Sequence, residues 1–236
     1  MLHTDEKNII KMRKTKNRIR VNKNNNYMKR ILLFVLITFS TSTVFGQTFE
    51  GKITYANTFK SQNPQMTDQQ LQSMMGETQE YFIKNGDYKN ETNGTLMQWQ
   101  LYVNSENKLF TKMTNSEIVF WNDGLVNSDS ILNVKLNKNV INILGYDCDE
   151  LIFTCESGIQ KYYFNSALKV NVSLFENHKL GNWYEYLKES KSLPLKIIMI
   201  NSQFILESIA TEVKEMTINE NELKLPKNQK IAKSPY

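Results

Sequence analysis

Apolar and polar residues alternate along much of the chain with a period of two, which is typical of half-buried β-strands. In the segment 49–55, Phe49 and Ile53 fall on one face and Lys52 on the other, and the segment 97–104 alternates in the same way. Antiparallel sheets with one face on a core and one face in water produce this pattern. We therefore expect a mainly β protein.

Turn signals separate the alternating segments. Asn85-Gly86 lies between two short apolar runs, which indicates a hairpin because both central residues of a type I′ turn need a positive φ. Asn93-Gly94 and Glu156-Ser157-Gly158 mark further turns. The last strands are predicted at 195–200, 204–213 and 216–218. Strands of this regularity favour a single curved antiparallel sheet or an unclosed barrel.

The clearest helix signal begins at Thr67, where Gln70 completes a capping box. The apolar stripe that follows is Leu71, Met74 and Met75. It ends near Gly76, as expected for a short helix. The segment 129–136 has a weaker pattern that fits a second helix or a strand. The sequence thus predicts one or two short helices covering the sheet.

An export signal is predicted near the start of the chain. Met28-Lys29-Arg30 is a short basic segment, and the apolar run 31–39 follows it. This arrangement predicts a signal peptide at 28–46, cleaved between Gly46 and Gln47. A membrane anchor is the weaker interpretation, because the apolar run is shorter than the ~20 residues that cross a bilayer.

Positive charge is concentrated before the predicted cleavage site. Ten of the 29 basic and two of the 24 acidic residues lie in 1–46, so this segment carries +8 and the rest −3, for a net charge of +5. We therefore expect no nucleic-acid partner. Residues 1–27 are predicted to be a disordered basic extension, either an artefact of a start site upstream of Met28 or a long basic part of the signal. Residues 47–236 are expected to form one β-rich domain without a transmembrane anchor, periplasmic or secreted.

Catalytic and metal-binding signatures are absent from the sequence. It contains no G-x-S-x-G, G-x-x-x-x-G-K-[ST] or H-E-x-x-H motif. His178 is the only histidine after residue 46, and its polar neighbours predict an exposed side chain. The acidic run 147–150 is interpreted as a solvated turn, without the spacing of metal ligands. We therefore expect a non-enzymatic protein with no catalytic residue, metal or cofactor.

Cys148 and Cys155 are predicted to be two separate buried thiols. An extended strand between them would hold their Cα atoms roughly 23 Å apart, whereas a disulfide needs about 7 Å or less. Their odd separation also places them on opposite faces of a regular strand.

Short motifs across residues 47–236 resemble an exported Gram-negative family of unknown function. They are Phe49–Tyr55, Tyr81–Lys89, Ile143–Cys148 (ILGYDC), Leu193–Ile197 (LPLKI) and Glu222–Pro226. That family is similar to the lipoprotein-carrier (LolA-like) superfamily. The resemblance implies an unclosed antiparallel barrel with helices over its mouth, and it implies no particular site residues.

Methionine and aromatic side chains gather in the predicted helix and the early strands. The candidate ligand-binding residues are Met74, Met75, Phe82, Met97, Trp99, Leu101 and Met113. Methionine adapts to varied apolar surfaces, and the concave face of an open barrel is filled by side chains, a helix or a ligand. The set therefore predicts either an ordinary core or a pocket for a lipid or a lipoprotein acyl chain, with the helix at 67–76 as its lid.

The alternative hypothesis is an envelope protein–protein interaction module without a small-molecule ligand. Its candidate surfaces are the edges of the sheet and the aromatic segment Trp183–Tyr186. Its partner would be another envelope protein.

Overall fold

In this computed structural model of the protein, the described residues are 12, 13, 15, 18 and 48–235. The four described residues before position 48 have helical backbone. The rest of the predicted basic extension and the whole predicted signal peptide lie outside the described residues. Residues from Thr48 onward form one compact unit. Across the described residues, no helix combines the length and apolar character needed to cross a membrane.

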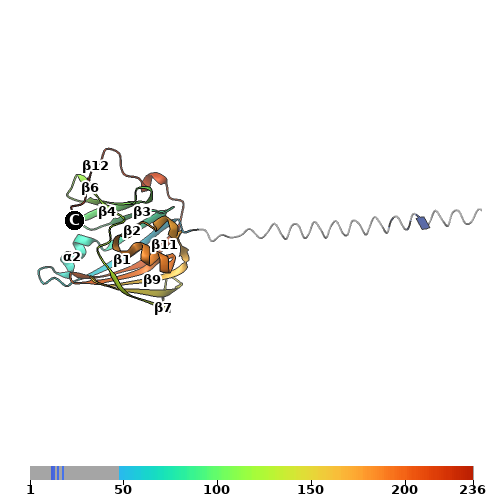
Figure 1. The fold of residues 1–236 in the computed structure, drawn as a ribbon, viewed down its shortest axis with the longest axis horizontal. Helices are drawn as coiled ribbons and strands as arrows, with labels where there is room; N and C mark the ends of the chain where they lie inside the picture. The colour runs from blue at the N-terminus through green and yellow to red at the C-terminus, as the bar shows by residue number, and fades with distance from the viewer. Residues whose placement is uncertain (1–11, 14, 16–17, 19–47, 236) are drawn as a thin grey trace, which may run out of the picture. The chain divides into compact units, whose positions relative to one another are not determined.

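One twelve-stranded sheet forms the framework of this unit (Figure 1). The strands are β1 (Gly51–Ser61), β2 (Thr78–Lys84), β3 (Asp87–Thr92), β4 (Met97–Val103), β5 (Lys108–Met113), β6 (Ile118–Asp123), β7 (Ile131–Ile143), β8 (Tyr146–Cys155), β9 (Gly158–Lys169), β10 (Ser192–Asn201), β11 (Phe204–Glu215) and β12 (Lys230–Lys233). Their order is β12-β6-β5-β4-β3-β2-β1-β11-β10-β9-β8-β7, so β7 and β12 are free edges and the barrel is not closed. Neighbours are antiparallel, except that β12 runs parallel to β6. The predicted mainly β, unclosed sheet is confirmed.

Two short helices and several 3₁₀ turns accompany the sheet. They are α2 (Asp68–Met75), α3 (Trp183–Ser190), η1 (Asn104–Glu106), η2 (Val172–Phe175), η3 (Leu180–Asn182) and η4 (Glu220–Leu223). The prediction of α2 is confirmed down to its capping box, in which Thr67 and Gln70 bond reciprocally, and it ends at Gly76. Of the segment 129–136, predicted as a helix or a strand, residues 131–136 belong to strand β7. Residues 216–218 form no strand.

Predicted turns close the hairpins. Asn85 and Gly86 have φ values of 50° and 89° and join β2 to β3. Gly158 begins β9 with a φ of 144°, and a Cβ there would lie 2.0 Å from the Ile200 carbonyl oxygen. A glycine is therefore required for the close approach of β9 and β10.

Helix α2 is fixed to the edge of β1 beyond the point where β2 stops pairing with it. The Gln72 side-chain amide donates to the Asn57 carbonyl (2.9 Å), and its oxygen accepts from the Phe59 amide (2.9 Å). The Asp68 carboxylate accepts from the Ser61 amide (2.7 Å). These side chains satisfy backbone groups that a neighbouring strand would otherwise pair.

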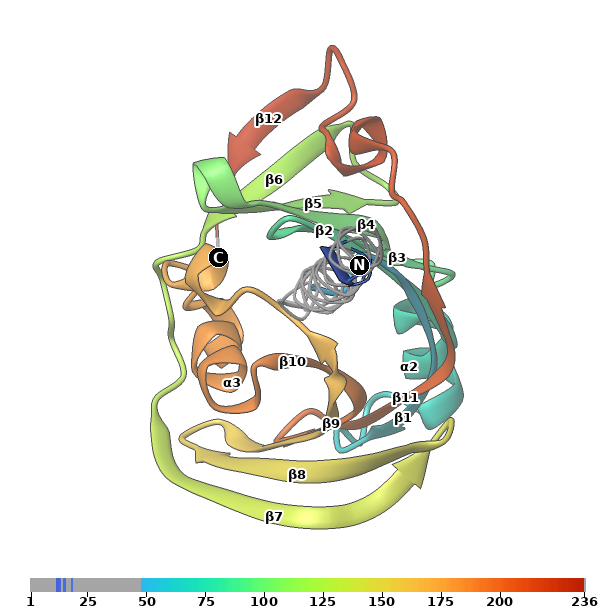
Figure 2. The ribbon, with the colours of Figure 1, turned by 90° about the vertical axis from the view of Figure 1, so that its right-hand side faces the viewer.

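The sheet bends so that its β2–β6 and β8–β10 parts lie on either side of α3 (Figure 2). Tyr186 and Leu187 of α3 are fully buried in the main hydrophobic core. A second, smaller core lies on the opposite face of the β2–β6 part. There, Leu101 and Phe110 pack with Ile218 of the C-terminal segment. The β2–β6 part is therefore covered on both faces.

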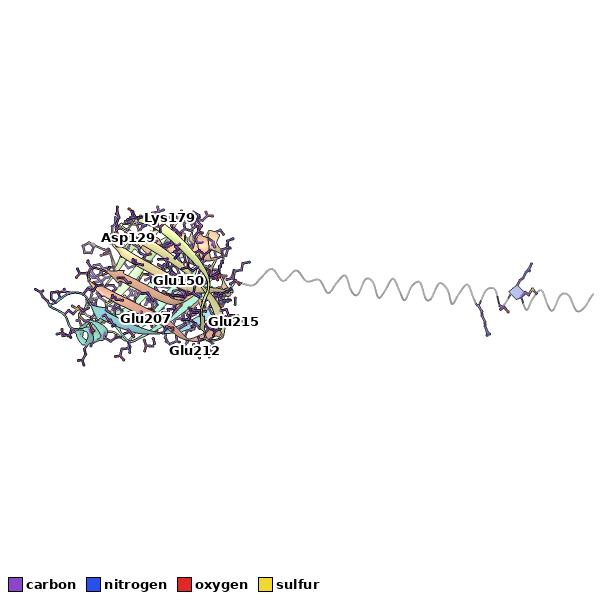
Figure 3. All side chains as sticks on the ribbon, turned by 90° about the horizontal axis from the view of Figure 1, so that it is seen from below. Asp129, Glu150, Lys179, Glu207, Glu212 and Glu215 are labelled. Atoms are coloured by element: carbon purple, nitrogen blue, oxygen red, sulfur yellow. The ribbon has the colours of Figure 1, made fainter. Side chains whose placement is uncertain are left out.

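A polar row crosses the outer face of the β7–β11 part (Figure 3). The Glu150 carboxylate accepts from the Tyr163 hydroxyl (2.7 Å) and the Asn137 amide (2.6 Å). Lys196 lies over the Tyr163 ring and pairs with Glu207 at 3.1 Å. Burial raises the pKa of Glu150, but these hydrogen bonds outweigh it and leave that pKa lowered. The acidic run 147–150 is thus part of strand β8, and its prediction as a turn is wrong.

Both cysteines are free, buried thiols, as predicted. They belong to one hydrophobic core, however, and not to opposite faces of the sheet. The pairing of β8 with β7 is irregular between Cys148 and Glu150, so the regular alternation on which the prediction rested does not hold along the whole strand. Burial raises the pKa of each thiol to about 11, so both are protonated at neutral pH.

Candidate functional site

A cavity of about 140 Å³ lies between α3 and the inner face of the sheet. It is lined by Tyr55, Gln79, Tyr81, Tyr88, Asn90, Gln100, Trp183, Pro194 and Ile197. These residues come from strands β1 to β4, helix α3 and strand β10. Segments more than a hundred residues apart in the sequence therefore build one cavity.

Strand register brings the polar lining residues into a row. Tyr81 pairs with Asn90 across β2 and β3, and Asn90 pairs with Gln100 across β3 and β4. Directly opposed residues of antiparallel strands point to the same face. Aromatic rings adjoin this row. The Tyr81 and Tyr88 rings are stacked with their centres 5.1 Å apart, and the centres of the Tyr88 and Trp183 rings are 6.3 Å apart.

Three buried polar atoms of the lining have no hydrogen-bond partner among the described residues. They are the Tyr81 hydroxyl, the Asn90 Oδ1 and the Trp183 Nε1. A buried polar group without a partner costs about 1–3 kcal/mol, so native proteins keep few of them. Three such atoms around one cavity make it the stronger candidate for a binding site.

Other buried tyrosines show that the Tyr81 hydroxyl is an exception. The Tyr55 hydroxyl donates to the Pro194 carbonyl (2.6 Å), and the Tyr186 hydroxyl donates to the Ser192 carbonyl (2.9 Å). The fold therefore provides partners for tyrosine hydroxyls where their role is structural.

The cavity is uncharged. None of its nine lining residues is acidic, basic or histidine. Burial raises the pKa values of Tyr55, Tyr81 and Tyr88 above their ordinary value of 10. These hydroxyls stay protonated at neutral pH, and an ion entering the cavity would meet no countercharge on its walls.

His178 supports the cavity wall from behind, and its prediction as an exposed residue is wrong. Its side chain is 2% exposed and its ring stacks on Tyr102 at 4.0 Å. Its Nε2 and the Tyr88 hydroxyl share a hydrogen bond of 2.8 Å, while its Nδ1 has no partner among the described residues. Burial lowers the pKa of His178 to about 3, so the ring is neutral.

Backbone bonds explain how a polar loop buries this histidine. The His178 amide donates to the Phe175 carbonyl (2.8 Å), and the Lys179 amide donates to the Gly124 carbonyl (2.6 Å). The Asn107 side chain donates to the Asn177 carbonyl (3.0 Å). The bonds to Gly124 and from Asn107 join segments more than fifty residues apart, so the local sequence does not show them.

The seven predicted ligand-binding residues do not line this cavity. Phe82, Trp99 and Leu101 belong to the second core, on the opposite face of β2 and β4. Met97 pairs with Met113 across β4 and β5. Met74 and Met75 form the end of α2. The residues of β2 and β4 that do line the cavity alternate with the predicted ones along the same strands. They have tyrosine and amide side chains and so point to the opposite face.

The aromatic segment Trp183–Tyr186 is not a free surface either. Tyr186 is fully buried and Trp183 lines the cavity. Tyr184 is half-buried, with the Lys179 ammonium 3.5 Å from its ring centre. The segment therefore offers less aromatic surface than the sequence suggests, and its role as a partner-binding surface stays a prediction.

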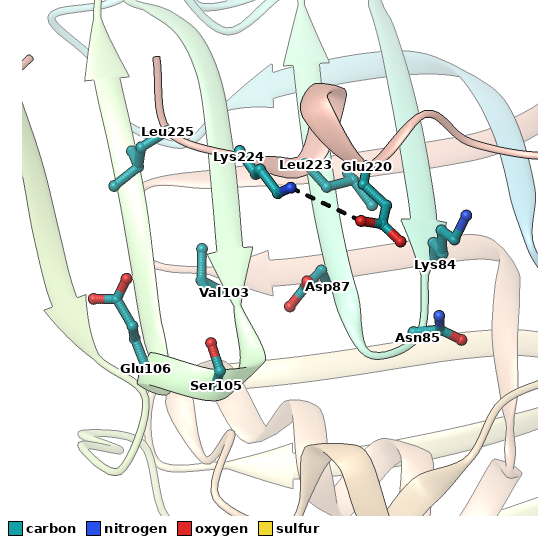
Figure 4. A pocket seen from close by; sticks show the side chains of 10 residues that line it. All are labelled: Lys84, Asn85, Asp87, Val103, Ser105, Glu106, Glu220, Leu223, Lys224 and Leu225. Carbon is teal, nitrogen blue, oxygen red and sulfur yellow. Dashed lines mark ion pairs between the residues drawn. The ribbon is translucent and has the colours of Figure 1, made fainter. Parts of the chain in front are cut away.

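A larger hollow of about 350 Å³ lies under the C-terminal segment (Figure 4). Lys84 and Asp87 line one side, and the ion pair between Glu220 and Lys224 (3.8 Å) lines the other. Lys84 is paired with the Glu50 carboxylate (3.2 Å). This hollow contains none of the buried unpartnered polar atoms found in the described residues, which makes it the weaker candidate. The described residues also contain no group of three or more His, Cys, Asp or Glu placed to hold a metal.

Comparisons with known proteins do not identify this chain. No family model matches it, and no curated protein matches it either. A solved structure described as "Structure of PNGF-II in P21 space group" has a TM-score of 0.43 and 12% sequence identity to it. That match covers 79% of this chain and 31% of the other, so the chain spans about a third of that protein's length. A likeness at this level carries no argument about function.

Proposed function

We propose that this protein is a non-enzymatic binding protein that holds a small uncharged ligand in the concave side of its open barrel. The observation that carries the proposal is the set of three unpartnered buried polar atoms around one cavity. Ligand sites typically combine apolar and aromatic walls with a few convergent polar groups. The cavity has both.

The free polar atoms define the chemistry of the ligand. The Trp183 N–H needs an acceptor, the Asn90 oxygen needs a donor, and the Tyr81 hydroxyl can serve either role. The neutral walls disfavour an ion. The ligand therefore carries uncharged hydroxyl or amide groups beside a surface that contacts aromatic rings.

The size of the cavity narrows the ligand further. Its volume of about 140 Å³ is below the roughly 300 Å³ typical of pockets for drug-sized molecules. A few non-hydrogen atoms, or the polar end of a longer molecule, fill it. The lipid expected from the sequence suits this cavity if its neutral headgroup, and not its acyl chain, occupies it. With the signal peptide predicted at 28–46, we propose that binding takes place in the periplasm or outside the cell.

Thermal shift with matched probes tests the proposal. We expect monooctanoylglycerol, which is uncharged and carries hydroxyl groups at its polar end, to raise the melting temperature of the purified chain. Octanoate has an apolar chain of the same length as monooctanoylglycerol but bears a charge, and we expect it to have no effect. Native mass spectrometry of protein purified without detergent supplies an independent readout of any ligand retained from the host. Stabilisation by octanoate alone, with no retained neutral mass, would contradict the proposal.

Single isosteric substitutions separate binding from folding. Tyr81→Phe removes a hydroxyl that has no partner, so we expect the free energy of unfolding of the empty protein to rise by about 1 kcal/mol. Tyr55→Phe, the matched control, removes the hydroxyl that donates to the Pro194 carbonyl and is expected to lower the free energy of unfolding by about 1–3 kcal/mol. Urea denaturation measures both changes. Tyr81→Phe should also lose affinity for any probe that stabilises the wild type, and opposite signs in the two unfolding experiments are the result that the proposal requires.

A further inference from the structure

The polar row of the cavity continues across the inner face of the sheet beyond the cavity. Tyr81, Asn90 and Gln100 line the cavity from β2, β3 and β4. Gln100 lies opposite Thr111 of β5, and Thr111 lies opposite Phe120 of β6. Directly opposed residues of antiparallel strands share a face, so these five residues form one row, which we call the inner row. Tyr81 is buried and the other four are half-buried, so the row leads from the cavity to side chains that a ligand can reach.

The inner row and the row beside it carry no charge. The neighbouring row consists of Ile83, Tyr88, Tyr102, Leu109 and Asn122. The opposite face of the same strands does carry charges, such as Lys89, Glu91 and Lys112. Charged residues are the usual side chains of accessible surfaces, yet the half-buried part of the inner row has amide, hydroxyl and aromatic groups instead. This combination favours a neutral, hydrogen-bonding partner.

Hydrogen bonds within the inner row leave both donors and acceptors free. The Gln100 amide donates to the Thr111 hydroxyl (3.3 Å), and in the described part of the chain this is the only hydrogen bond of either side chain. It leaves the Gln100 oxygen as an acceptor and the Thr111 hydroxyl as a donor. The Tyr81 hydroxyl and the Asn90 oxygen add to them. Hydroxyl groups of a ligand can both donate and accept, so a ligand with several hydroxyl groups matches the row.

The spacing of the inner row indicates the kind of hydroxylated ligand. Neighbouring strands lie about 4.8 Å apart, so the four polar side chains from Tyr81 to Thr111 span roughly 14 Å, which exceeds a glycerol headgroup. An extended peptide presents side chains to one face only about every 7 Å, and the backbone groups of inner strands are already paired with their neighbours. Linked sugar units carry hydroxyl groups at closer intervals. The C–H faces of their rings also suit aromatic side chains, which stand at both ends of the row.

We propose that the inner row binds a neutral carbohydrate of at least two sugar units, which lies across β2 to β5 with one end in the cavity. This inference rests on the proposed function, because the cavity holds the end of the same ligand. It adds Thr111 and Phe120 to the binding site, since neither residue lines the cavity. A free oligosaccharide and the headgroup of a glycolipid present the same hydroxyl groups to the row.

Neutral amphiphiles with the same chain length test the carbohydrate. Monooctanoylglycerol has a glycerol headgroup, whereas octyl maltoside and octyl cellobioside carry two sugar units on an eight-carbon chain. We expect calorimetric titration of the purified chain, below the micelle concentrations, to give a dissociation constant about tenfold lower for the tighter glycoside. This is the gain expected from about two additional neutral hydrogen bonds. Equal constants for all three compounds would overturn this inference and leave the proposed function intact, whereas binding of none would contradict both.

Competition separates the two sources of the carbohydrate. Displacement of the bound glycoside by free maltose or cellobiose supports an oligosaccharide ligand. A bound glycoside that neither sugar displaces supports a glycolipid headgroup. Displacement by a neutral peptide such as N-acetyl-trialanine amide, but by neither sugar, would overturn the carbohydrate.

An isosteric pair of variants tests the inner row itself. Thr111→Val removes the free donor and the acceptor for the Gln100 amide, so we expect the advantage of the glycoside over monooctanoylglycerol to fall several-fold. Thr154→Val is the matched control, because it removes an exposed hydroxyl from β8, and it should preserve the ratio of the two dissociation constants. Circular dichroism verifies that both variants are folded. The same ratio in both variants overturns the role of the inner row.

Discussion

Replacing Tyr186 by alanine is expected to lower the free energy of unfolding by about 3–5 kcal/mol, the range for removing a buried aromatic side chain. Tyr186 is fully buried and stacks on Tyr162 at 4.2 Å. Its hydroxyl donates to the Ser192 carbonyl (2.9 Å), which the substitution leaves without this partner. Tyr186 is therefore one of the main attachments of helix α3 to the sheet.

The same helix offers a matched control. Tyr184 is half-buried and its ring contacts the Lys179 ammonium, so Tyr184→Ala is expected to cost about 0.5–1 kcal/mol. Urea denaturation monitored by tryptophan fluorescence and circular dichroism measures both variants. The Trp183 ring lines the cavity, and its centre lies 5.4 Å from the centre of the Tyr186 ring. Loss of the Tyr186 side chain should therefore also weaken ligand binding. Equal costs for the two alanine variants would mean that α3 is not anchored through Tyr186.

Acid is expected to destabilise the fold through His178 by about 3 kcal/mol between pH 6.5 and pH 4. The pKa of His178 is about 3 in the folded protein, against its usual 6.5, because burial disfavours the charged ring. Between these two values the unfolded chain binds a proton that the folded chain does not. The stability contributed by the neutral ring is therefore complete above pH 6.5 and is lost as pH falls toward 3.

A pair of variants isolates this titration. Tyr88→Phe removes the hydroxyl that bonds to Nε2 but keeps the histidine, and Tyr88→Phe with His178→Phe keeps the stacked rings but removes the titrating group. Urea denaturation from pH 7 to pH 4 should show a steeper loss of stability for the single variant. Carboxylates with lowered pKa values, such as Glu50 and Asp149, also destabilise the protein when they are protonated in acid, but they do so equally in the two variants. Parallel pH profiles would refute the role of His178.

Local features of this protein were determined by the sequence itself. The capping box of Thr67 and Gln70 begins α2, and the turn Asn85-Gly86 connects β2 to β3. These features depend on residues within four positions of each other, so their physical causes are visible in a short segment. The alternation of apolar and polar residues likewise predicted most strands and the open antiparallel sheet.

The assignment of faces and the site were decided by the tertiary structure. Alternation shows that Tyr81 and Phe82 point to opposite faces of β2, but both faces are covered, one by α3 and the other by the C-terminal segment. The more apolar face is filled by distant side chains such as Ile218, and the tyrosine face retains the cavity. His178 is buried because residues from distant parts of the chain hold its loop. Burial depends on which segments meet in space, and no local pattern encodes that meeting.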